Sequence, residues 1–271
     1  MDLSTSDFDF ISKLIKQRSG IALTKEKQYL IDSRLIPIAK KLGLNEVVDL
    51  IAKLKSINDE ALINEVVETM TTNESSFMRD IKPFEQMKSI VIPYIKSQAP
   101  DKKSFRIWSA ACSNGQEPYS VAMSLKEAPG FGNYKFEIFA SDLTTHVLEK
   151  AKSGIYTQFE VQRGLPITLL LKYFEQHGDN WKIKDEIKSM VEFQKINLIE
   201  NFDRLGKFDI ILCRNVLIYF DSATKLQILN NFTKLMNPYS VLMLGCTENI
   251  LGMENKFKFI KDSASIFTLN N

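Results

Sequence analysis

The sequence is poor in the two residue types that most often bind metal ions or act beside nucleophiles. It has three cysteines and two histidines in 271 residues. An odd, small cysteine count gives no disulfide framework and favours a reducing compartment. Neither a CxxC nor an HExxH spacing occurs, and neither histidine lies beside a recognisable nucleophile motif, so we expect no metal site and no nucleophilic catalysis.

Long apolar runs and a strong net charge are also lacking. No segment approaches the ~18 apolar residues that a membrane helix needs. The first ten residues, MDLSTSDFDF, are acidic and do not resemble a signal peptide. The formal net charge is only +2, which argues against a nucleic-acid-binding protein. With 44% apolar and 25% charged residues, the composition is typical of a globular protein, and we expect a cytoplasmic protein with no membrane insertion.

Residues 1–72 show helical periodicity and no alternating strand pattern. Apolar residues recur at helical spacing in 8–15, 24–41, 44–55 and 59–70. Pro37 should bend or interrupt the second of these helices, because proline has no N–H to donate. We predict an all-α N-terminal domain at 1–72.

The small net charge conceals a basic stretch in this region. Residues 13–41 contain eight basic and two acidic side chains, whereas 42–74 contain seven acidic and two basic ones. A solvated helix face is the simpler interpretation, and a docking face for an acidic partner is the functional one. The candidate docking residues are Lys25, Lys27, Arg34, Lys40 and Lys41.

After residue 100, apolar segments of strand length alternate with helical patterns, which is typical of a parallel, doubly wound α/β sheet. The rhythm breaks at about 154–190, where a short helix and a Gly178-Asp179-Asn180 turn predict an insertion of small antiparallel strands. The predicted strands are 105–112, 135–143, 191–198, 208–213 and 241–246, with one or two more in 257–269, and the main helices are 116–126, 145–152 and 223–236.

Candidate site residues follow these strands, because ligands of doubly wound sheets bind beyond the carboxyl ends of the strands. The loop 109–115, SAACSNG, has one glycine where a dinucleotide-binding GxGxxG loop has three. It favours a nucleoside ligand without phosphate, such as S-adenosylmethionine (SAM), although small residues also serve helix packing. Asp142 could accept both ribose hydroxyls or cap the next helix. Asn215 follows the fourth strand with an amide that donates and accepts hydrogen bonds.

Five segments together resemble the signature segments of the CheR-type chemotaxis receptor (protein-glutamate) O-methyltransferase family. They are NESSFMRD, RIWSAACSNGQEPYS, ASDLTTHVLEKAKSGIY, FDIILCRNVLIYFD and LMLGCTENILG. The resemblance covers nearly the whole chain. It implies a SAM-dependent, Rossmann-like methyltransferase domain at 73–271, with a small β-subdomain inserted at about 154–190. The implied activity is methyl transfer from SAM to glutamate side chains on the cytoplasmic helices of methyl-accepting chemotaxis receptors, giving a glutamate methyl ester and S-adenosylhomocysteine.

The resemblance also assigns roles to individual residues. Arg79 and Tyr219 would lie nearest the transferring methyl group, with no metal involved. Whether Arg79 contacts the carboxylate of the substrate or of SAM stays open, and Tyr219 could equally be a packing residue. The implied cofactor-binding residues are Asn73, Ser75, Arg79, Glu117, Asp142, Asn197, Leu198, Asn215 and Val216.

Partners and alternatives follow from the same motifs. We expect a monomer that docks receptor helices through its basic residues. The short turn at 178–180 argues against tethering to a receptor pentapeptide, for which family members tend to carry a longer glycine-bearing loop. A noncatalytic SAM-binding signalling module and an NAD-type oxidoreductase are the alternative functions, and the missing GxGxxG counts against the second.

The cysteines raise a separate question. Cys112, Cys213 and Cys246 each end a predicted strand, and in the strand order usual for these methyltransferases the three strands are neighbours. Their thiols could therefore lie together near the cofactor. Three small, buried apolar residues are the simpler interpretation.

Overall fold

The computed structural model describes residues 3–250, 252–260, 263 and 265–270. Its contacts divide the chain into two compact units. The helical unit comprises Met1–Thr72 and Tyr219–Thr224, and the sheet unit comprises Asn73–Ile218 and Lys225–Asn271. Among the described residues, no helix has both the length and the apolar character needed to cross a membrane.

The helical unit is built from amphipathic helices, as the sequence periodicity predicts. Ser4 begins the first helix by accepting a hydrogen bond from the backbone N–H of Asp7, and Gly20 ends it in the left-handed conformation. The buried side chains of each helix lie on one face and form the core of the unit. The helices are α1 (Thr5–Ser19), the 3₁₀ turn η1 (Lys25–Lys27), α2 (Gln28–Lys41), α3 (Val47–Ser56) and α4 (Glu60–Thr69).

Pro37 lies inside α2 and does not interrupt it, so of the two predicted effects, a bend or an interruption, the interruption was wrong. Proline removes one hydrogen bond from a helix. The turns on both sides of Pro37 are nevertheless held by burial of Ile31, Leu35 and Ile38 against the neighbouring helices. Tertiary packing outweighs the local cost.

The helical unit also includes a segment far away in the sequence. The backbone N–H of Ala22 donates to the carbonyl oxygen of Tyr219 at 2.9 Å, and Ile21 forms an isolated antiparallel bridge with Phe220. Lys16 forms an ion pair with Asp221. The 3₁₀ turn η4 (Leu217–Tyr219) therefore ends in the helical unit, whereas the strand before it belongs to the sheet unit.

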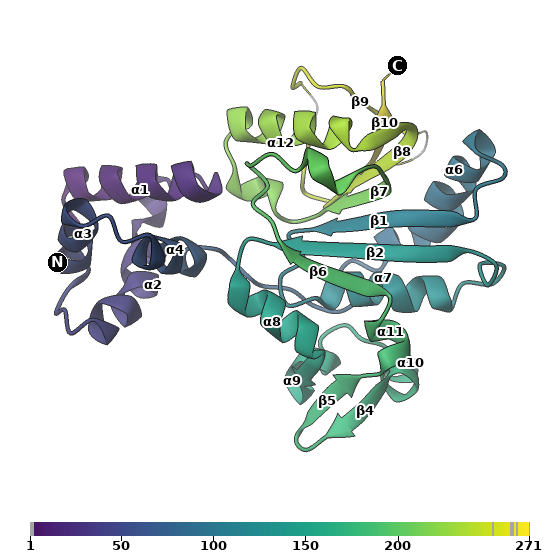
Figure 1. The fold of residues 1–271 in the computed structure, drawn as a ribbon, viewed down its shortest axis with the longest axis horizontal. Coiled ribbons are helices and arrows are strands. Elements are labelled where there is room, and N and C mark those ends of the chain that lie inside the picture. Colours follow the sequence, from purple (N-terminus) through teal and green to yellow (C-terminus); the bar gives the residue numbers. More distant parts are fainter. Residues whose placement is uncertain (1–2, 251, 261–262, 264, 271) are drawn as a thin grey trace. The chain divides into compact units, whose positions relative to one another are not determined.

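The sheet unit contains a seven-stranded sheet in the order β6-β2-β1-β7-β8-β10-β9 (Figure 1). The first five strands are parallel, as the alternation of strands and helices predicts, whereas β10 and β9 are antiparallel. Parallel neighbouring strands need a crossover connection, which is usually a helix. The described residues between β8 and β9 include no helix. The strands are β1 (Ser104–Ala110), β2 (Lys135–Asp142), β6 (Val191–Lys195), β7 (Phe208–Cys213), β8 (Met236–Leu244), β9 (Phe257–Phe259) and β10 (Ile266–Leu269).

Helices cover both faces of this sheet, which explains why its central strands are apolar without alternation. Ile107 of β1 belongs to the core cluster that contains Tyr119 and Val121 of α7. The next residue, Trp108, points to the opposite face and contacts the ring of Phe232 in α12 at 5.3 Å. The flanking helices are α5 (Lys82–Gln86), the π-helical turn η2 (Met87–Val91), α6 (Ile92–Gln98), α7 (Gln116–Lys126), α8 (Thr145–Ser153) and α12 (Ser222–Lys234), and the 3₁₀ turn η3 (Asp203–Leu205) precedes β7.

The insertion forms a separate three-stranded antiparallel sheet in the order β3-β5-β4, as predicted from the broken rhythm. Its core extends to the segment before α5, because the ring of Phe77 packs edge-on against Tyr156 at 4.9 Å and Phe174 at 5.6 Å. The elements of the insertion are β3 (Ile155–Thr157), α9 (Gln158–Gln162), α10 (Ile167–Tyr173), β4 (Phe174–His177), β5 (Asn180–Ile183) and α11 (Asp185–Lys188).

Candidate active site

The carboxyl ends of β1, β2 and β7 lie beside one another, so the loops that follow them gather at one edge of the sheet. The backbone N–H of Ser113 donates to Asp142 Oδ2 at 2.9 Å. The Ser113 hydroxyl donates to the carbonyl oxygen of Asn73 at 2.7 Å. The structure therefore brings together three of the sequence-predicted parts, namely the loop after β1, the carboxylate after β2 and the start of the 73–80 segment.

Backbone strain is concentrated in these loops. Within the described part of the chain, five residues other than glycine have a φ of +48° to +62°, in the left-handed region, and each of them lies in the 73–80 segment, after β1 or after β7. Such conformations cost free energy and persist at functional sites, where the surrounding structure enforces them. The five residues are Met78, Asp80, Ala111, Ser113 and Asn215.

Asp142 is 6% exposed and has a local as well as a candidate binding role. Its second oxygen, Oδ1, accepts the backbone N–H of Thr144 at 3.0 Å, at the start of α8. Burial raises the pKa of Asp142, although the N–H groups of Thr144 and Ser113 oppose this effect by stabilising the carboxylate. The Thr144 side chain and the Leu143 backbone also hydrogen-bond to this carboxylate.

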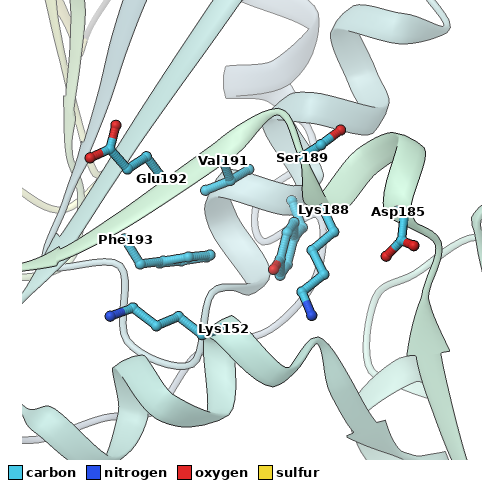
Figure 2. A pocket seen from close by; sticks show the side chains of 8 residues that line it. Lys152, Asp185, Lys188, Ser189, Val191, Glu192 and Phe193 are labelled. Atoms are coloured by element: carbon cyan, nitrogen blue, oxygen red, sulfur yellow. The ribbon is translucent and has the colours of Figure 1, made fainter.

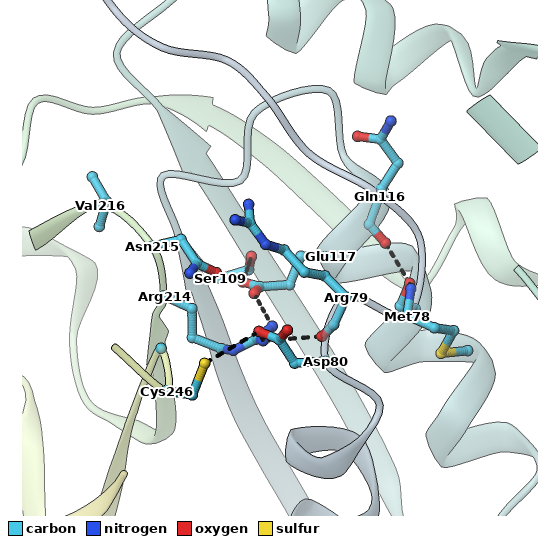
Figure 3. Close-up of polar contacts among 12 residues, drawn as sticks. Met78, Arg79, Asp80, Ser109, Gln116, Glu117, Arg214, Asn215, Val216 and Cys246 are labelled. Carbon is cyan, nitrogen blue, oxygen red and sulfur yellow. Dashed lines mark hydrogen bonds and ion pairs between the residues drawn. The ribbon is translucent and has the colours of Figure 1, made fainter. Parts of the chain in front are cut away.

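Arg214, which is buried, forms an ion pair with the half-buried Glu117 (Figure 3). The Arg214 side chain is 1% exposed, and its Nη1 donates to Glu117 Oε2 at 2.8 Å. Its Nη2 donates to the carbonyl oxygen of Arg79 at 3.0 Å and to Asp80 Oδ2 at 3.1 Å. The hydroxyl of Ser109 donates to the other oxygen of Glu117 at 2.7 Å. Arg214, which the sequence analysis did not include among the site residues, thus ties the 73–80 segment to β7 and α7.

Glu248 is a second residue that the sequence analysis missed. It is 6% exposed, and its carboxylate accepts four backbone N–H groups at 2.7 to 2.8 Å. Three of these donors are Asn215, Val216 and Leu217 after β7, and the fourth is Gly245 after β8. Glu248 lies in the segment LMLGCTENILG, which carries part of the family resemblance. The sequence of that segment does not reveal which backbone groups the glutamate binds.

The remaining predicted site residues are spread over the two units. Arg79 is exposed and donates to the carbonyl oxygen of Glu74 at 3.4 Å. Tyr219 is half-buried and belongs to the helical unit, whereas Arg79 belongs to the sheet unit. Asn197 and Leu198 are buried shortly after β6, and Ser75 is half-buried in the 73–80 segment. Their roles toward a cofactor stay predictions.

Comparison with known proteins identifies the chain. Residues 6–71 match the all-alpha domain of the CheR methyltransferases, and residues 73–266 match the CheR methyltransferase SAM-binding domain. The chain belongs to the CheR methyltransferase family. This confirms the resemblance and the fold class drawn from the sequence motifs.

Two curated relatives are similar over nearly their whole length. The chemotaxis protein methyltransferase Cher2 of Pseudomonas putida is 36% identical over 271 residues, which cover 98% of each chain. The chemotaxis protein methyltransferase of Vibrio anguillarum is 38% identical over 97% of this chain and 96% of its own. Among solved structures, a magnesium protoporphyrin IX methyltransferase of Synechocystis with bound S-adenosylhomocysteine is 15% identical, at a TM-score of 0.33 over 64% of this chain and 61% of that one.

This CheR family member is a SAM-dependent methyltransferase, and its residues fit SAM on structural grounds. SAM carries two ribose hydroxyls and an ammonium group but no phosphate. The buried carboxylate of Asp142 can accept hydroxyls, and Glu117 in the first turn of α7 can accept an ammonium group. Gly115 serves packing, because a Cβ there would lie 2.7 Å from the Cβ of Ala151.

The cysteines of this CheR family member do not form a reactive cluster. Cys112 and Cys213 are buried, and burial together with nearby carboxylates raises the pKa of both thiols, so they are neutral. The expectation of three buried cysteines was wrong for Cys246, which is exposed because it follows the end of β8. In the part of the chain that the structure describes, no three His, Cys, Asp or Glu side chains are grouped as metal ligands.

The basic residues of the helical unit have different local roles. Lys25, Lys27 and Lys40 are exposed, and Lys41 pairs with Glu65 at 2.8 Å. Arg34 donates to the carbonyl oxygens of Met70 and Thr71 at 2.6 and 3.0 Å and to Thr72 Oγ1 at 2.9 Å. Arg34 therefore caps the carboxyl end of α4, where carbonyl groups lack helical partners.

A cavity of about 470 Å³ lies away from these loops, at the amino end of the edge strand β6 (Figure 2). Tyr119, Val191 and Phe193 supply its apolar wall, and Lys152 and Lys188 lie at its rim. None of the predicted site residues lines it. The candidate active site is therefore the cluster of loops after β1, β2 and β7.

Proposed function

We propose that this methyltransferase transfers a methyl group from SAM to glutamate side chains on the cytoplasmic helices of methyl-accepting chemotaxis receptors. The observation that carries the proposal is the chemistry of the loop cluster. It offers carboxylates, an amide and an arginine, whereas the histidines, His146 and His177, are both exposed and lie in other elements. A site without a histidine base suits a substrate that is already an anion.

A glutamate carboxylate has a normal pKa of about 4.3 and is ionised at neutral pH, so no proton has to be removed. When bound, SAM supplies a methyl group on a positively charged sulfur, and the carbon–sulfur bond breaks as a glutamate oxygen bonds to the carbon, leaving S-adenosylhomocysteine and a methyl ester. The protein must align the two partners at about 3 Å and exclude water.

The assigned residues divide this task. Asp142 holds the ribose hydroxyls, Glu117 the ammonium group, and Asn197 and Leu198 the adenine. Asn73, Ser75, Asn215 and Val216 complete the cofactor site from the surrounding loops. Arg79 orients a carboxylate through its planar guanidinium, and Tyr219 lies nearest the transferring methyl group.

Receptor docking falls to the helical domain at 1–72. The exposed residues Lys25, Lys27 and Lys40 are suited to the acidic methylation helices of receptors. The protein acts as a cytoplasmic monomer. The two-residue turn of Gly178 and Asp179 between β4 and β5 leaves no long loop for tethering a receptor pentapeptide.

Labelled SAM and receptor-containing membranes test the proposal directly. Base-labile methyl label on the receptor, released as methanol, is expected because glutamate esters hydrolyse in alkali. Binding of S-adenosylhomocysteine without any label would instead favour a noncatalytic signalling module. Binding of a nicotinamide cofactor in place of S-adenosylhomocysteine would favour the oxidoreductase.

A further inference from the structure

A second cavity, of about 540 Å³, borders the segment that carries Arg79. It is lined by residues 76–81 on one side and by Arg163 and Gly164 of the insertion on the other. Two arginines, Arg79 and Arg163, therefore line one cavity. Arg163 belongs to none of the segments that carry the family resemblance, and no role follows for it from the cofactor site.

The insertion is held firmly against this segment. Gly164 has a φ of +93°, and a Cβ on it would lie 2.3 Å from the carbonyl oxygen of Phe77. The Phe77 ring is buried against Tyr156 and Phe174 of the insertion. The turn between α9 and α10 therefore has one position relative to residues 76–81, and Arg163 is presented to the cavity by packed structure.

A carboxylate already binds one of the two arginines. Glu74 forms an ion pair with Arg163, and its carbonyl oxygen accepts a hydrogen bond from Arg79. Both guanidinium groups lower the pKa of Glu74, Arg163 most strongly. No carboxylate of the described residues lies within ion-pair distance of Arg79 itself. Because Glu74 and Arg163 are exposed, their pair is weak and can exchange with another carboxylate.

We infer that Arg163 and Arg79 form the binding site for the substrate glutamate carboxylate, and that Glu74 competes for it as an internal mimic. Planar guanidinium groups suit a carboxylate that must be held in one orientation. The surroundings fit a protein helix as its carrier, since Ile81, which lines the cavity, is 63% exposed. The helix α10, which begins three residues after Gly164, also exposes apolar side chains, Ile167 by 64% and Leu171 by 66%. The inference rests on the proposed glutamate methylation and adds the residue that recognises its substrate.

The variants R163Q and E74Q test this inference, because a merely structural ion pair would make them equivalent. If Arg163 binds substrate, R163Q should raise KM for a receptor fragment roughly tenfold or more through loss of a charge-assisted contact. E74Q should lower KM roughly two- to fivefold by removing the competitor. Neither variant should change the dissociation constant of S-adenosylhomocysteine. The control variants K126Q and E186Q break an exposed ion pair of the same unit away from the cavity and should change neither quantity.

The outcomes separate this inference from the proposed function. If the wild-type protein methylates the receptor but R163Q and E74Q shift KM in the same direction, or not at all, the inference is wrong and the proposed function stands. If the wild-type protein transfers no methyl group, the proposed function itself fails. The affinity of the fragment for protein saturated with S-adenosylhomocysteine gives a second readout, in which the two variants should again move in opposite directions.

Discussion

Two charged side chains, Glu248 and Arg214, hold the loops of the candidate active site in place. The carboxylate of Glu248 accepts four backbone N–H groups from the loops after β7 and β8. Arg214 connects the loop after β7 to Glu117 and to the backbone of Arg79. The positive φ of Asn215 and Asp80 is enforced by these bonds. Both residues act through the groups they position.

Replacement of Glu248 tests this support. E248Q places an amide NH₂ among N–H donors, so at least one buried group loses its partner, which costs about 1–3 kcal/mol. We expect a loss of that size in the free energy of unfolding, measured by denaturant titration, together with weaker binding of S-adenosylhomocysteine. The variant E254Q, on an exposed side chain of the same loop region, should change neither. Unchanged affinity in E248Q would show that the loops after β7 and β8 do not hold the cofactor.

The raised pKa of Asp142 predicts a pH dependence of cofactor binding. In the proposed cofactor site, ribose hydroxyls donate to the ionised carboxylate, so affinity should be full above the raised pKa and decrease, by up to about tenfold per pH unit, below it. Since the pKa lies above its ordinary value of 3.8, the decrease begins at a higher pH than for an exposed aspartate. Calorimetric titration with S-adenosylhomocysteine from about pH 8 to pH 5 measures it. An identical profile in D142N would assign the effect to another group.

Sequence reasoning finds some of these residues and not others for a physical reason. Asp142 is the last residue of a strand, so its position at the carboxyl edge of the sheet is predictable from the strand alone. Glu248 and Arg214 act on backbone groups of Asn215 and Arg79, which are 33 and 135 residues away in the chain. Backbone groups have no sequence signature, so such contacts appear only in the fold.

On the scale of the elements, the packing of the insertion against the 73–80 segment depends on the close approach of Gly164 to the backbone of Phe77. Gly164 allows the turn between α9 and α10 to lie against the carbonyl group of Phe77, where a side chain does not fit. Gly178, in the turn between β4 and β5, also has a positive φ, but a Cβ on it would meet no atom within 4 Å. A side chain at Gly178 would therefore meet backbone strain alone, whereas one at Gly164 would meet both backbone strain and a steric clash.

Alanine at these two positions should give different losses of stability. G178A should lower the free energy of unfolding by about 1–2 kcal/mol, from the positive φ alone. G164A should cost about 2–5 kcal/mol, because the backbone must also shift. Denaturant titration of both variants measures the difference. Equal losses would mean that the approach of the turn to Phe77 is not tight.

Most elements follow from periodicity, and the exceptions have local causes. The helix α7 at Gln116–Lys126 and the strand β7 at Phe208–Cys213 were predicted at their observed ends. The strand β8 starts five residues before its predicted start, at Met236, which was predicted to end the helix 223–236. Asn237 and Pro238 lie in an irregular part of the pairing with β7. The apolar residues after Arg214 do not extend β7, and Leu217–Tyr219 form the 3₁₀ turn η4.

On the scale of the whole molecule, the net charge of +2 hides an uneven distribution of charge. In the helical domain a basic stretch at 13–41 is followed by an acidic one that starts at 42. Its exposed basic residues favour an acidic partner, but not all of them are available. Arg34 caps α4, so a charge reversal there would damage the fold and report nothing about docking. Lys25 and Lys27 are exposed and suit the test.

Charge reversal at Lys25 and Lys27 should weaken receptor recognition without altering the cofactor site. The double variant K25E/K27E should raise KM for receptor several-fold at low salt, and the difference should shrink as salt screens the charges. The double variant K256E/K258E changes the net charge equally on exposed residues of the sheet unit and should have little effect. Methylation rates at two ionic strengths provide the measurement. Equal effects of both double variants would indicate a general charge effect, contrary to docking.

The central claim is methyl transfer to glutamate, and the ratio of products tests it most directly. Purified protein, SAM and a receptor fragment should yield one S-adenosylhomocysteine per methyl ester, with each ester located on a glutamate by mass spectrometry. A fragment with those glutamates replaced by glutamine should accept no methyl group, because an amide is not an anionic nucleophile. Methyl transfer to another residue type, or binding of S-adenosylhomocysteine without transfer to any receptor fragment, would contradict the account.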